Sequence, residues 1–264
     1  MLSTDVSSSE ITEAIVYTAI ADVLDPELDE SLVKLGFINS VQVDGCNVTV
    51  TFKLPTYWCA PNFAYLMAAD LRARIKEIPN VCSIRVLLLE HCTDEEVSAG
   101  VNAGKSFMEV FPDEATDNLE ELRLIFLRKG FLVRQDTLLR QLQKAGFDEA
   151  TLLALRVADM VIDQTTQQVT VTTPLLVGQL KRAAHTARAY LQRARALGVH
   201  NGPEDLLFVN DHGQPILCGE LQAYLRQSRS VRMNIMFNTV FCTDMFQARY
   251  GPGANKALPE GEQA

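Results

Sequence analysis

The chain has 264 residues, of which 47% are hydrophobic and 22% are charged, and its formal net charge is −9. A chain of this size can bury at least one full core and form one or two domains. A net acidic protein has no general electrostatic attraction to nucleic acid or to an anionic membrane, so we expect neither as a partner. The acidity is uneven, because residues 1–110 hold 7 Lys/Arg against 16 Asp/Glu.

The sequence shows the pattern of neither a membrane-spanning helix nor a secretion signal. No stretch reaches the roughly 18 apolar residues of a membrane-spanning helix. The first residues are Ser-rich and acidic, without the cationic and then apolar pattern of a signal peptide. Six cysteines are scattered without a CxxC pair, which fits free thiols in a reducing cytoplasm. We therefore expect a cytoplasmic protein without a disulfide framework.

The first predicted element is a helix over residues 11–24. Ser7 and Glu10 have the spacing of a capping box, and apolar residues then recur with helical periodicity. Asp25 and the proline that follows it end this helix, because the residue before a proline is biased away from helical conformation.

A hairpin, a helix and a strand follow. Residues 37–43 and 47–52 alternate apolar and polar side chains around an Asp-Gly pair, which is typical of a β-hairpin. Pro61 is well placed as the first residue of a helix that ends near Lys76, and residues 81–89 read as a buried strand. The order helix, strand, strand, helix, strand predicts a small α+β domain that ends near residue 90.

The second part of the chain has a different pattern of predicted helices and strands. Residues 93–111 begin as a helix, and the polar, acidic connector at 112–118 is the predicted domain boundary. The elements predicted beyond it are two or three short helices over 119–157, two strands around 164–167, a helix over 175–197, a hairpin around 211–213 and a helix from about 219.

These elements give an α+β fold class and three segments. A small α-β-β-α-β domain occupies residues 1–112, and a mostly helical α+β domain for partner recognition occupies residues 113–250. The tail at 251–264 is rich in Gly, Pro and Glu and is predicted to be disordered.

Residues 13–89 resemble the metal–sulfur cluster assembly family, which includes SufT-like and PaaD-like proteins and cytosolic iron–sulfur targeting factors. The matching stretches are VLDPEL at 23–28, SLVKLGFI at 31–38, VTVTF at 48–52, TYWCAP at 56–61 and the strand after IPNV at 78–81. The family usually has proline directly after the cysteine, whereas Ala60 intervenes here.

The resemblance implies a role in maturing iron–sulfur or other metalloproteins. It implies a transient cargo of an iron–sulfur cluster or iron, and a client metalloenzyme such as a multicomponent di-iron oxygenase. A homodimer is the implied assembly if two copies share one cluster. We recognise no family resemblance in residues 113–264.

Cys59 is the main candidate for binding the cargo. It lies between a predicted strand and the helix from Pro61, where the helix dipole stabilises a thiolate. Iron–sulfur clusters normally take about four cysteine ligands, so a second copy or a client would have to supply the others. The plain alternative is that Cys59 is a small buried hydrophobic residue.

Asp25, Glu27 and Thr56 are candidates for shaping the same site. The carboxylates of Asp25 and Glu27 suit a hard metal ligand or a hydrogen bond that orients the Cys59 loop. Their ordinary role would be to end one helix and to cap the next element. Thr56 is expected to hydrogen-bond the thiolate or to cap the loop.

His91 and Cys92 are further candidate ligands, because imidazole and thiolate both suit zinc or iron. Adjacent residues on a strand point to opposite faces, so both reach one ion only if the strand has already ended. Trp58, the only tryptophan, is a candidate for partner binding. The remaining cysteines are predicted to be ordinary core or surface thiols: Cys46, Cys82, Cys218 and Cys242.

Three functional hypotheses follow from these residues. The first is a maturation factor that carries or transfers a cluster or iron through Cys59. The second is a metal-free adaptor or chaperone that docks an apo-metalloenzyme. The third, a thiol-dependent enzyme, is weaker because no base is evident near Cys59. The sequence contains no Gly-rich phosphate loop, HExxH or GxSxG, so we assign no catalytic residue and do not expect an enzyme.

Overall fold

The computed structural model describes residues 10–113 and 119–251. These residues divide into two compact units, of which the first contains 10–113, 119 and 238–251 and the second contains 120–237. The predicted capping residue Ser7 lies outside the described residues, and so does all of the predicted tail except Gly251. Among the described residues, no helix combines the length and the apolar character needed to cross a membrane.

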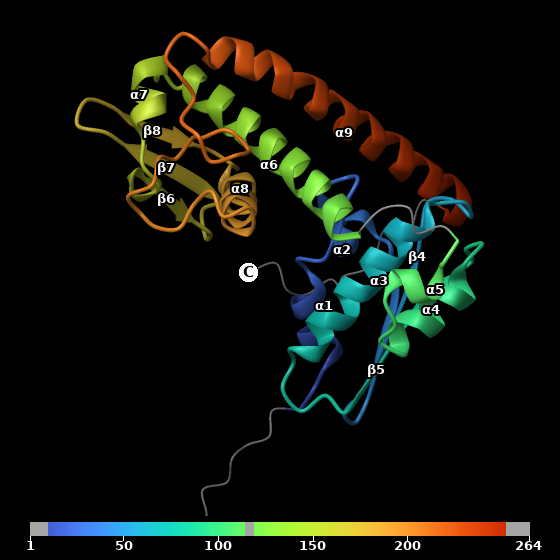
Figure 1. Cartoon of the computed structure of the whole chain (residues 1–264). Coiled ribbons are helices and arrows are strands. Elements are labelled where there is room, and N and C mark those ends of the chain that lie inside the picture. The colour runs from blue at the N-terminus through green and yellow to red at the C-terminus, as the bar shows by residue number, and fades with distance from the viewer. Residues whose placement is uncertain (1–9, 114–118, 252–264) are drawn as a thin grey trace, which may run out of the picture. The chain divides into compact units, whose positions relative to one another are not determined.

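The first unit is the α+β domain predicted from the sequence (Figure 1). Its elements are α1 (Glu13–Ile20), β1 (Leu24–Asp25), β2 (Glu30–Ser31), α2 (Leu32–Leu35), β3 (Ile38–Asp44), β4 (Asn47–Lys53), α3 (Pro61–Lys76), β5 (Ser83–Leu89), α4 (Asp94–Asn102), α5 (Phe107–Val110) and the end of α9 (Leu221–Tyr250).

The starts of the helices in this unit follow local chemistry. Helix α1 begins after Thr12, whose Oγ1 accepts a hydrogen bond from Ile15 N at 3.3 Å. Pro61 opens α3, as predicted, because the missing N–H of proline has no partner to lose there. The helix predicted over 93–111 is instead two helices, α4 and α5, because the chain breaks at Gly104 with φ +71°.

Three strands form the main sheet in the order β3-β4-β5. Strands β3 and β4 make the predicted antiparallel hairpin, whereas β4 and β5 are parallel and are joined through α3. The carboxyl ends of the two parallel strands meet at one edge, where Lys53 lies opposite Leu89. The loop after β4 therefore lies beside the loop after β5.

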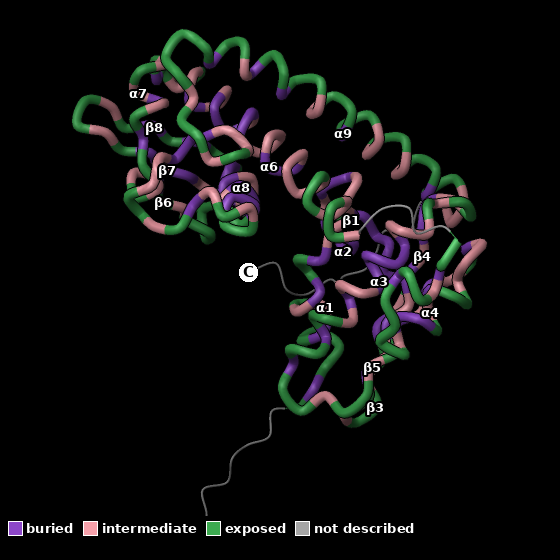
Figure 2. The backbone as a smooth tube through the Cα atoms, in the orientation of Figure 1, coloured by how far each residue is buried: buried purple, intermediate pink, exposed green. Residues whose placement is uncertain are grey.

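The core of this unit lies between the sheet and the helices α1 and α3 (Figure 2). Alternate residues of β4, namely Val48, Val50 and Phe52, are buried. Helix α4 covers the free edge of β5, and side chains of α4 form hydrogen bonds with the backbone of that strand. Asn102 accepts from Val86 N at 2.9 Å and donates to Val86 O at 2.8 Å. These bonds occupy an edge that would otherwise be open to strand pairing.

One prediction about the cysteines was wrong, because Cys46 and Cys82 form a disulfide with their Cα atoms 5.2 Å apart. Cys46 precedes β4, Cys82 precedes β5, and the register pairs Asn47 with Ser83. The two cysteines are therefore neighbours at the start of parallel strands, although 36 positions separate them in the sequence. The other four cysteines are not part of a disulfide.

The second unit combines helices with a small antiparallel sheet in the order β6-β7-β8. Its elements are α6 (Leu119–Lys144), α7 (Glu149–Ala154), a 3₁₀ turn (Val157–Asp159), β6 (Met160–Asp163), β7 (Gln168–Thr172), β8 (Val177–Leu180), α8 (Ala184–Ala196) and the first part of α9.

Three of the elements predicted here differ in the structure. Residues 119–157 contain the 26-residue helix α6 rather than several short helices, and Gly130 is buried within it. The helix predicted over 175–197 is partly strand, because residues 177–180 pair with β7 before α8 begins. The hairpin predicted over 206–217 is only an isolated bridge between Val209 and Pro215.

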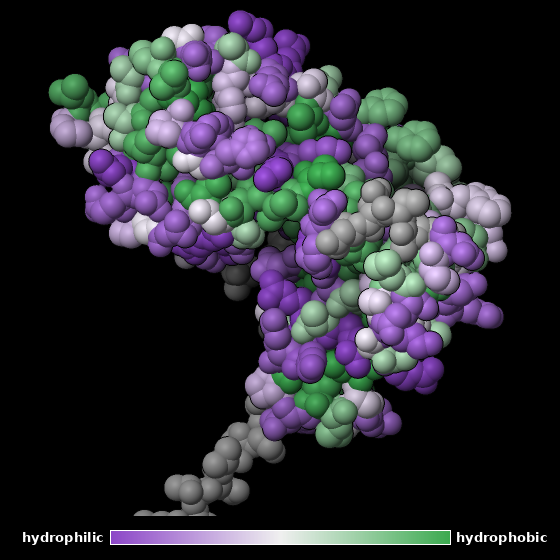
Figure 3. Space-filling model, in the orientation of Figure 1, coloured by the Kyte–Doolittle hydropathy of each residue, from purple (hydrophilic) through white to green (hydrophobic). Residues whose placement is uncertain are grey.

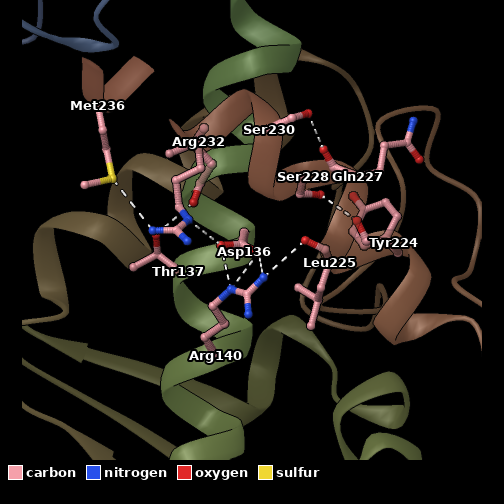
Figure 4. Close-up of polar contacts among 11 residues, drawn as sticks. Asp136, Thr137, Arg140, Tyr224, Leu225, Gln227, Ser228, Ser230, Arg232 and Met236 are labelled. Carbon is pink, nitrogen blue, oxygen red and sulfur yellow. Dashed lines mark hydrogen bonds and ion pairs between the residues drawn. The ribbon is translucent and has the colours of Figure 1, made fainter. Parts of the chain in front are cut away.

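A buried ion-pair network joins α6 to α9 within this unit (Figure 4). Asp136 is fully buried, and its carboxylate lies 2.9 Å from both Arg140 and Arg232. Arg140 also donates to the carbonyl of Leu225 at 3.1 Å. The network satisfies a carboxylate that would be costly to bury alone.

Helix α9 has 30 residues and contributes to both units. Its residues 221–237 belong to the second unit, whereas residues 238–250, which were predicted to lie in the second domain, pack in the first. One side of the helix is buried or half-buried and the other is exposed (Figure 2).

Candidate functional site

The site is built at the edge where β4 and β5 end. The loop after β4 carries Cys59, which is followed by Ala60 as the N-cap residue of α3 and by Pro61 as its first residue. Cys59 is a free, half-buried thiol that packs against the core of the first unit. Its place at the amino end of a 16-residue helix is the one predicted from the sequence.

Thr56 lies directly beside this thiol. The distance between Thr56 Oγ1 and Cys59 Sγ is 3.2 Å. The same oxygen accepts a hydrogen bond from Trp58 N at 3.3 Å, so its own proton is available for the sulfur.

His91 connects the loop after β5 to the Cys59 loop. Its Nε2 lies 2.7 Å from the backbone carbonyl of Cys59, which only accepts, so Nε2 carries the proton. Its Nδ1 then accepts from Thr93 N at 3.2 Å. Burial lowers the pKa of His91, which favours this neutral form. Both ring nitrogens are therefore occupied, and in this conformation His91 positions the Cys59 loop.

Cys92 adds a second link between the two loops. Its backbone N donates to the carbonyl of Tyr57 at 3.0 Å, while its sulfur lies 3.9 Å from His91 Nδ1. Within residues 10–113 and 119–251, no group of three or more His, Cys, Asp or Glu is arranged to hold a metal ion. The predicted roles of His91 and Cys92 as metal ligands stay predictions.

Asp25 closes the turn between β1 and β2. Its Oδ1 accepts from Glu27 N at 2.9 Å and from Leu28 N at 3.0 Å. The side chain is buried, and burial raises its pKa to about 6, with a smaller contribution from the charge of Glu27. These bonds match the ordinary capping role considered for Asp25. Its carboxyl also titrates closer to neutrality than an exposed aspartate does.

A comparison with protein families identifies the class of this domain. Residues 13–86 match the family described as iron-sulfur cluster assembly protein. The N-terminal part of the chain belongs to this family. The match confirms the predicted family and supports a role in iron–sulfur cluster assembly or maturation. No curated protein and no solved structure matches the chain.

The matched segment ends within β5, so part of the site lies outside it. Cys59, Thr56 and Asp25 fall inside the assembly domain as matched, whereas His91 and Cys92 come just after it. Contacts that hold the Cys59 loop in place therefore come partly from residues beyond the matched segment.

The end of α9 is the part of the site that the sequence did not indicate. Arg249 donates to the carbonyl of Glu90 at 2.7 Å and to that of Leu54 at 3.4 Å, so it ties together the starts of both site loops. Phe246 packs on Phe37 with ring centroids 4.9 Å apart. The only signal in the sequence was the helical spacing of inward-facing residues. That spacing does not say which domain the helix covers.

Glu27 and Trp58 complete the surroundings. Glu27 Oε1 accepts from Asn238 Nδ2 of α9 at 3.4 Å. Trp58 is 76% exposed and makes an edge-on contact with Tyr57, with ring centroids 4.9 Å apart. An exposed tryptophan next to the thiol suits contact with another protein, and its partner-binding role stays a prediction.

Proposed function

We propose that this protein assists the maturation of metalloenzymes by carrying an iron–sulfur cluster, or iron, on Cys59 and passing it to a client. The observation that carries the proposal is the Cys59 thiol, 3.2 Å from the Thr56 hydroxyl, inside the segment that matches the iron–sulfur cluster assembly family. The cluster is a cargo that the protein binds transiently. The client is a metalloenzyme, with a multicomponent di-iron oxygenase as the proposed class.

The Cys59 site suits transfer rather than permanent binding. A half-buried thiol in a loop supplies one ligand, whereas clusters normally take about four. A second copy of the chain or the client then provides the rest, and replacing one thiolate by another moves the cluster. The hydrogen bonds from His91 and Cys92 hold the loop in place, so that the thiol needs little rearrangement.

Anaerobic reconstitution tests this proposal. Wild type, Cys59→Ala and Cys218→Ala are loaded with iron and sulfide, and both elements are measured after desalting. Cys218 is an exposed free thiol of the second unit and is the matched control. We expect wild type and Cys218→Ala to retain iron and sulfide and Cys59→Ala to lose them. Equal retention by all three proteins would contradict the proposal.

A metal-free adaptor is the second candidate, and the outer side of α9 favours it. Large apolar side chains there are between 38% and 70% exposed: Met233, Met236 and Phe237 in the second unit, and Val240, Phe241 and Met245 in the first. Hydrophobic side chains also appear along α9 in the space-filling view (Figure 3). Methionine-rich surfaces adapt to different partners.

The adaptor hypothesis makes a different prediction in cells. If the protein only docks an apo-enzyme, Cys59→Ala supports the iron content of a di-iron oxygenase as well as wild type does, whereas a Val240→Ser, Phe241→Ser variant fails. A carrier gives the opposite result for Cys59→Ala. The readout is the iron content of the purified client.

A further inference from the structure

Helix α9 brings another thiol, Cys242, to the same unit as Cys59. Within the helix, Asn238, Cys242 and Phe246 are spaced by four residues and therefore lie on one side. Asn238 bonds Glu27 and Phe246 packs on Phe37, so this side faces the assembly domain. Cys242 is half-buried and packs against the same hydrophobic core as Cys59.

Contacts on both sides of Cys242 fix this part of α9 over the site. Toward the amino end, Asn238 contacts Glu27 in the turn between β1 and β2. Toward the carboxyl end, Arg249 donates to the carbonyls of Leu54 and Glu90, from which the two site loops start. Cys242 lies between these contacts along the helix.

The electrostatic surroundings of Cys242 agree with this placement. Burial raises the pKa of its thiol to about 11, and the negative groups that add to the shift are Asp25, Cys59 and Glu27. The thiols and carboxyls come from three different parts of the unit: the turn between β1 and β2, the loop before α3, and α9. Of these groups, the two thiols are of the type that iron–sulfur clusters normally take as ligands.

We propose that Cys242 is the second thiol of the cargo site, and that Cys59 and Cys242 of one chain bind the cluster or a soft metal ion together. The cluster as cargo rests on the proposed function. Each thiol releases its proton to solvent when its sulfur binds the metal. Two thiolates from one chain leave about two of the usual four ligand positions open. A second copy of the chain, or two thiols of the client, fills those positions.

In this site, α9 contributes a ligand that the matched segment lacks. The family match covers residues 13–86 and includes one free cysteine, Cys59, since Cys46 and Cys82 are joined. The helix supplies the second thiol from a distant part of the sequence. Among the described residues, no group of three or more His, Cys, Asp or Glu is arranged to hold a metal ion.

Two measurements test the pair. The first is the intact mass, under anaerobic conditions, after treatment with phenylarsine oxide. This trivalent arsenical forms a stable ring with two neighbouring thiols. The second is the iron and sulfide content after reconstitution. Both use full-length wild type, Cys59→Ser, Cys242→Ser and Cys218→Ser. Serine keeps the size of the side chain, and circular dichroism checks that each variant is folded.

We expect wild type and Cys218→Ser to form the arsenical adduct and to retain iron, and Cys59→Ser and Cys242→Ser to lose the adduct and at least half of the iron. If Cys242→Ser keeps the adduct and the iron while Cys59→Ser loses both, Cys242 is not part of the site. That result would refute the two-thiol proposal and leave the proposed function intact. If the adduct needs both thiols but wild type binds no iron, the two-thiol site is supported and the iron cargo is refuted. Neither adduct nor iron in wild type would refute both.

Discussion

His91 donates a hydrogen bond from Nε2 to the backbone carbonyl of Cys59, and the two atoms are 2.7 Å apart. The bond joins residues that are 32 positions apart, and it holds the loop that presents the candidate thiol. We predict that His91→Ala destabilises the protein by about 1–3 kcal/mol, because a buried acceptor loses its donor. It should also speed amide exchange in residues 56–61, measured by hydrogen–deuterium exchange. Unchanged exchange in this loop would contradict the positioning role.

The same residue makes stability depend on pH. Burial holds the pKa of His91 in the folded protein below its ordinary value of 6.5. As pH falls below 6.5, the unfolded state takes up a proton that the folded state resists, so stability decreases. His91→Gln keeps an amide donor for the Cys59 carbonyl but does not titrate. Urea unfolding across this range should therefore show a smaller loss of stability on acidification for His91→Gln than for wild type.

Asp25 should show a pH dependence of the opposite sign. Its pKa is about 6 in the folded protein against an ordinary 3.8. Between these values the unfolded carboxyl is ionised while the folded one still holds its proton, so stability falls as pH rises through this window. Asp25→Asn retains an Oδ1 acceptor for the turn. We predict that it raises the free energy of unfolding by up to about 3 kcal/mol above pH 6, with no gain below about pH 4.

Urea denaturation of wild type and Asp25→Asn at several pH values measures this difference. The matched control is Asp44→Asn, because Asp44 is exposed at the end of β3. A loss of stability in Asp25→Asn at neutral pH would show that the ionised carboxylate makes a favourable contact in the folded protein.

Arg249 should hold the carboxyl-terminal part of α9 against the two site loops. Its guanidinium donates to the carbonyls of Leu54 and Glu90, and hydrogen bonds to charged groups contribute about 1.5–3 kcal/mol each. We predict that Arg249→Ala increases amide exchange in residues 238–250 and raises the rate at which iodoacetamide alkylates Cys242. Arg226→Ala, at an exposed position of the same helix, is the control and should change neither. Equal rates in both variants would mean that Arg249 does not hold the helix.

Asp136 should be essential for the second unit. Replacing it by alanine leaves Arg140 and Arg232 without their buried carboxylate, and breaking a buried pair typically costs about 3–5 kcal/mol. We predict that Asp136→Ala lowers stability by this amount and increases exchange in α6, while exposed Asp244→Ala has little effect. A variant as stable as wild type would show that the network contributes little.

The elements predicted correctly from the sequence are those that local chemistry specifies. The Asp-Gly turn between alternating runs gave the β3–β4 hairpin, and Pro61 gave the start of α3. Cys59 was placed correctly before that helix for the same reason. Its contact with Thr56 is local, whereas its contact with His91 requires the parallel pairing of β4 and β5, which no short stretch of sequence encodes.

The errors come from long-range packing. Residues 119–157 were predicted to form two or three short helices, but Gly130 is buried within the continuous helix α6. Residues 177–180 have helical neighbours in the sequence, yet pairing with β7 makes them a strand. The contribution of Cys242 could not be predicted, because it depends on which unit the end of α9 packs against.

The Cys46–Cys82 disulfide makes stability depend on the redox conditions. It closes a loop with a sequence separation of 36, for which loop-closure entropy corresponds to about 4 kcal/mol. The sulfurs meet at the starts of β4 and β5, on the edge of the sheet opposite the Cys59 loop. We predict that reduction, or Cys46→Ala with Cys82→Ala, destabilises the first unit and leaves the Cys59 loop folded. Thermal unfolding with and without a phosphine reductant measures this. The melting temperature of wild type should fall on reduction, and that of the double variant should not change. A melting temperature of wild type that does not respond to the reductant would show that the bond does not form in solution.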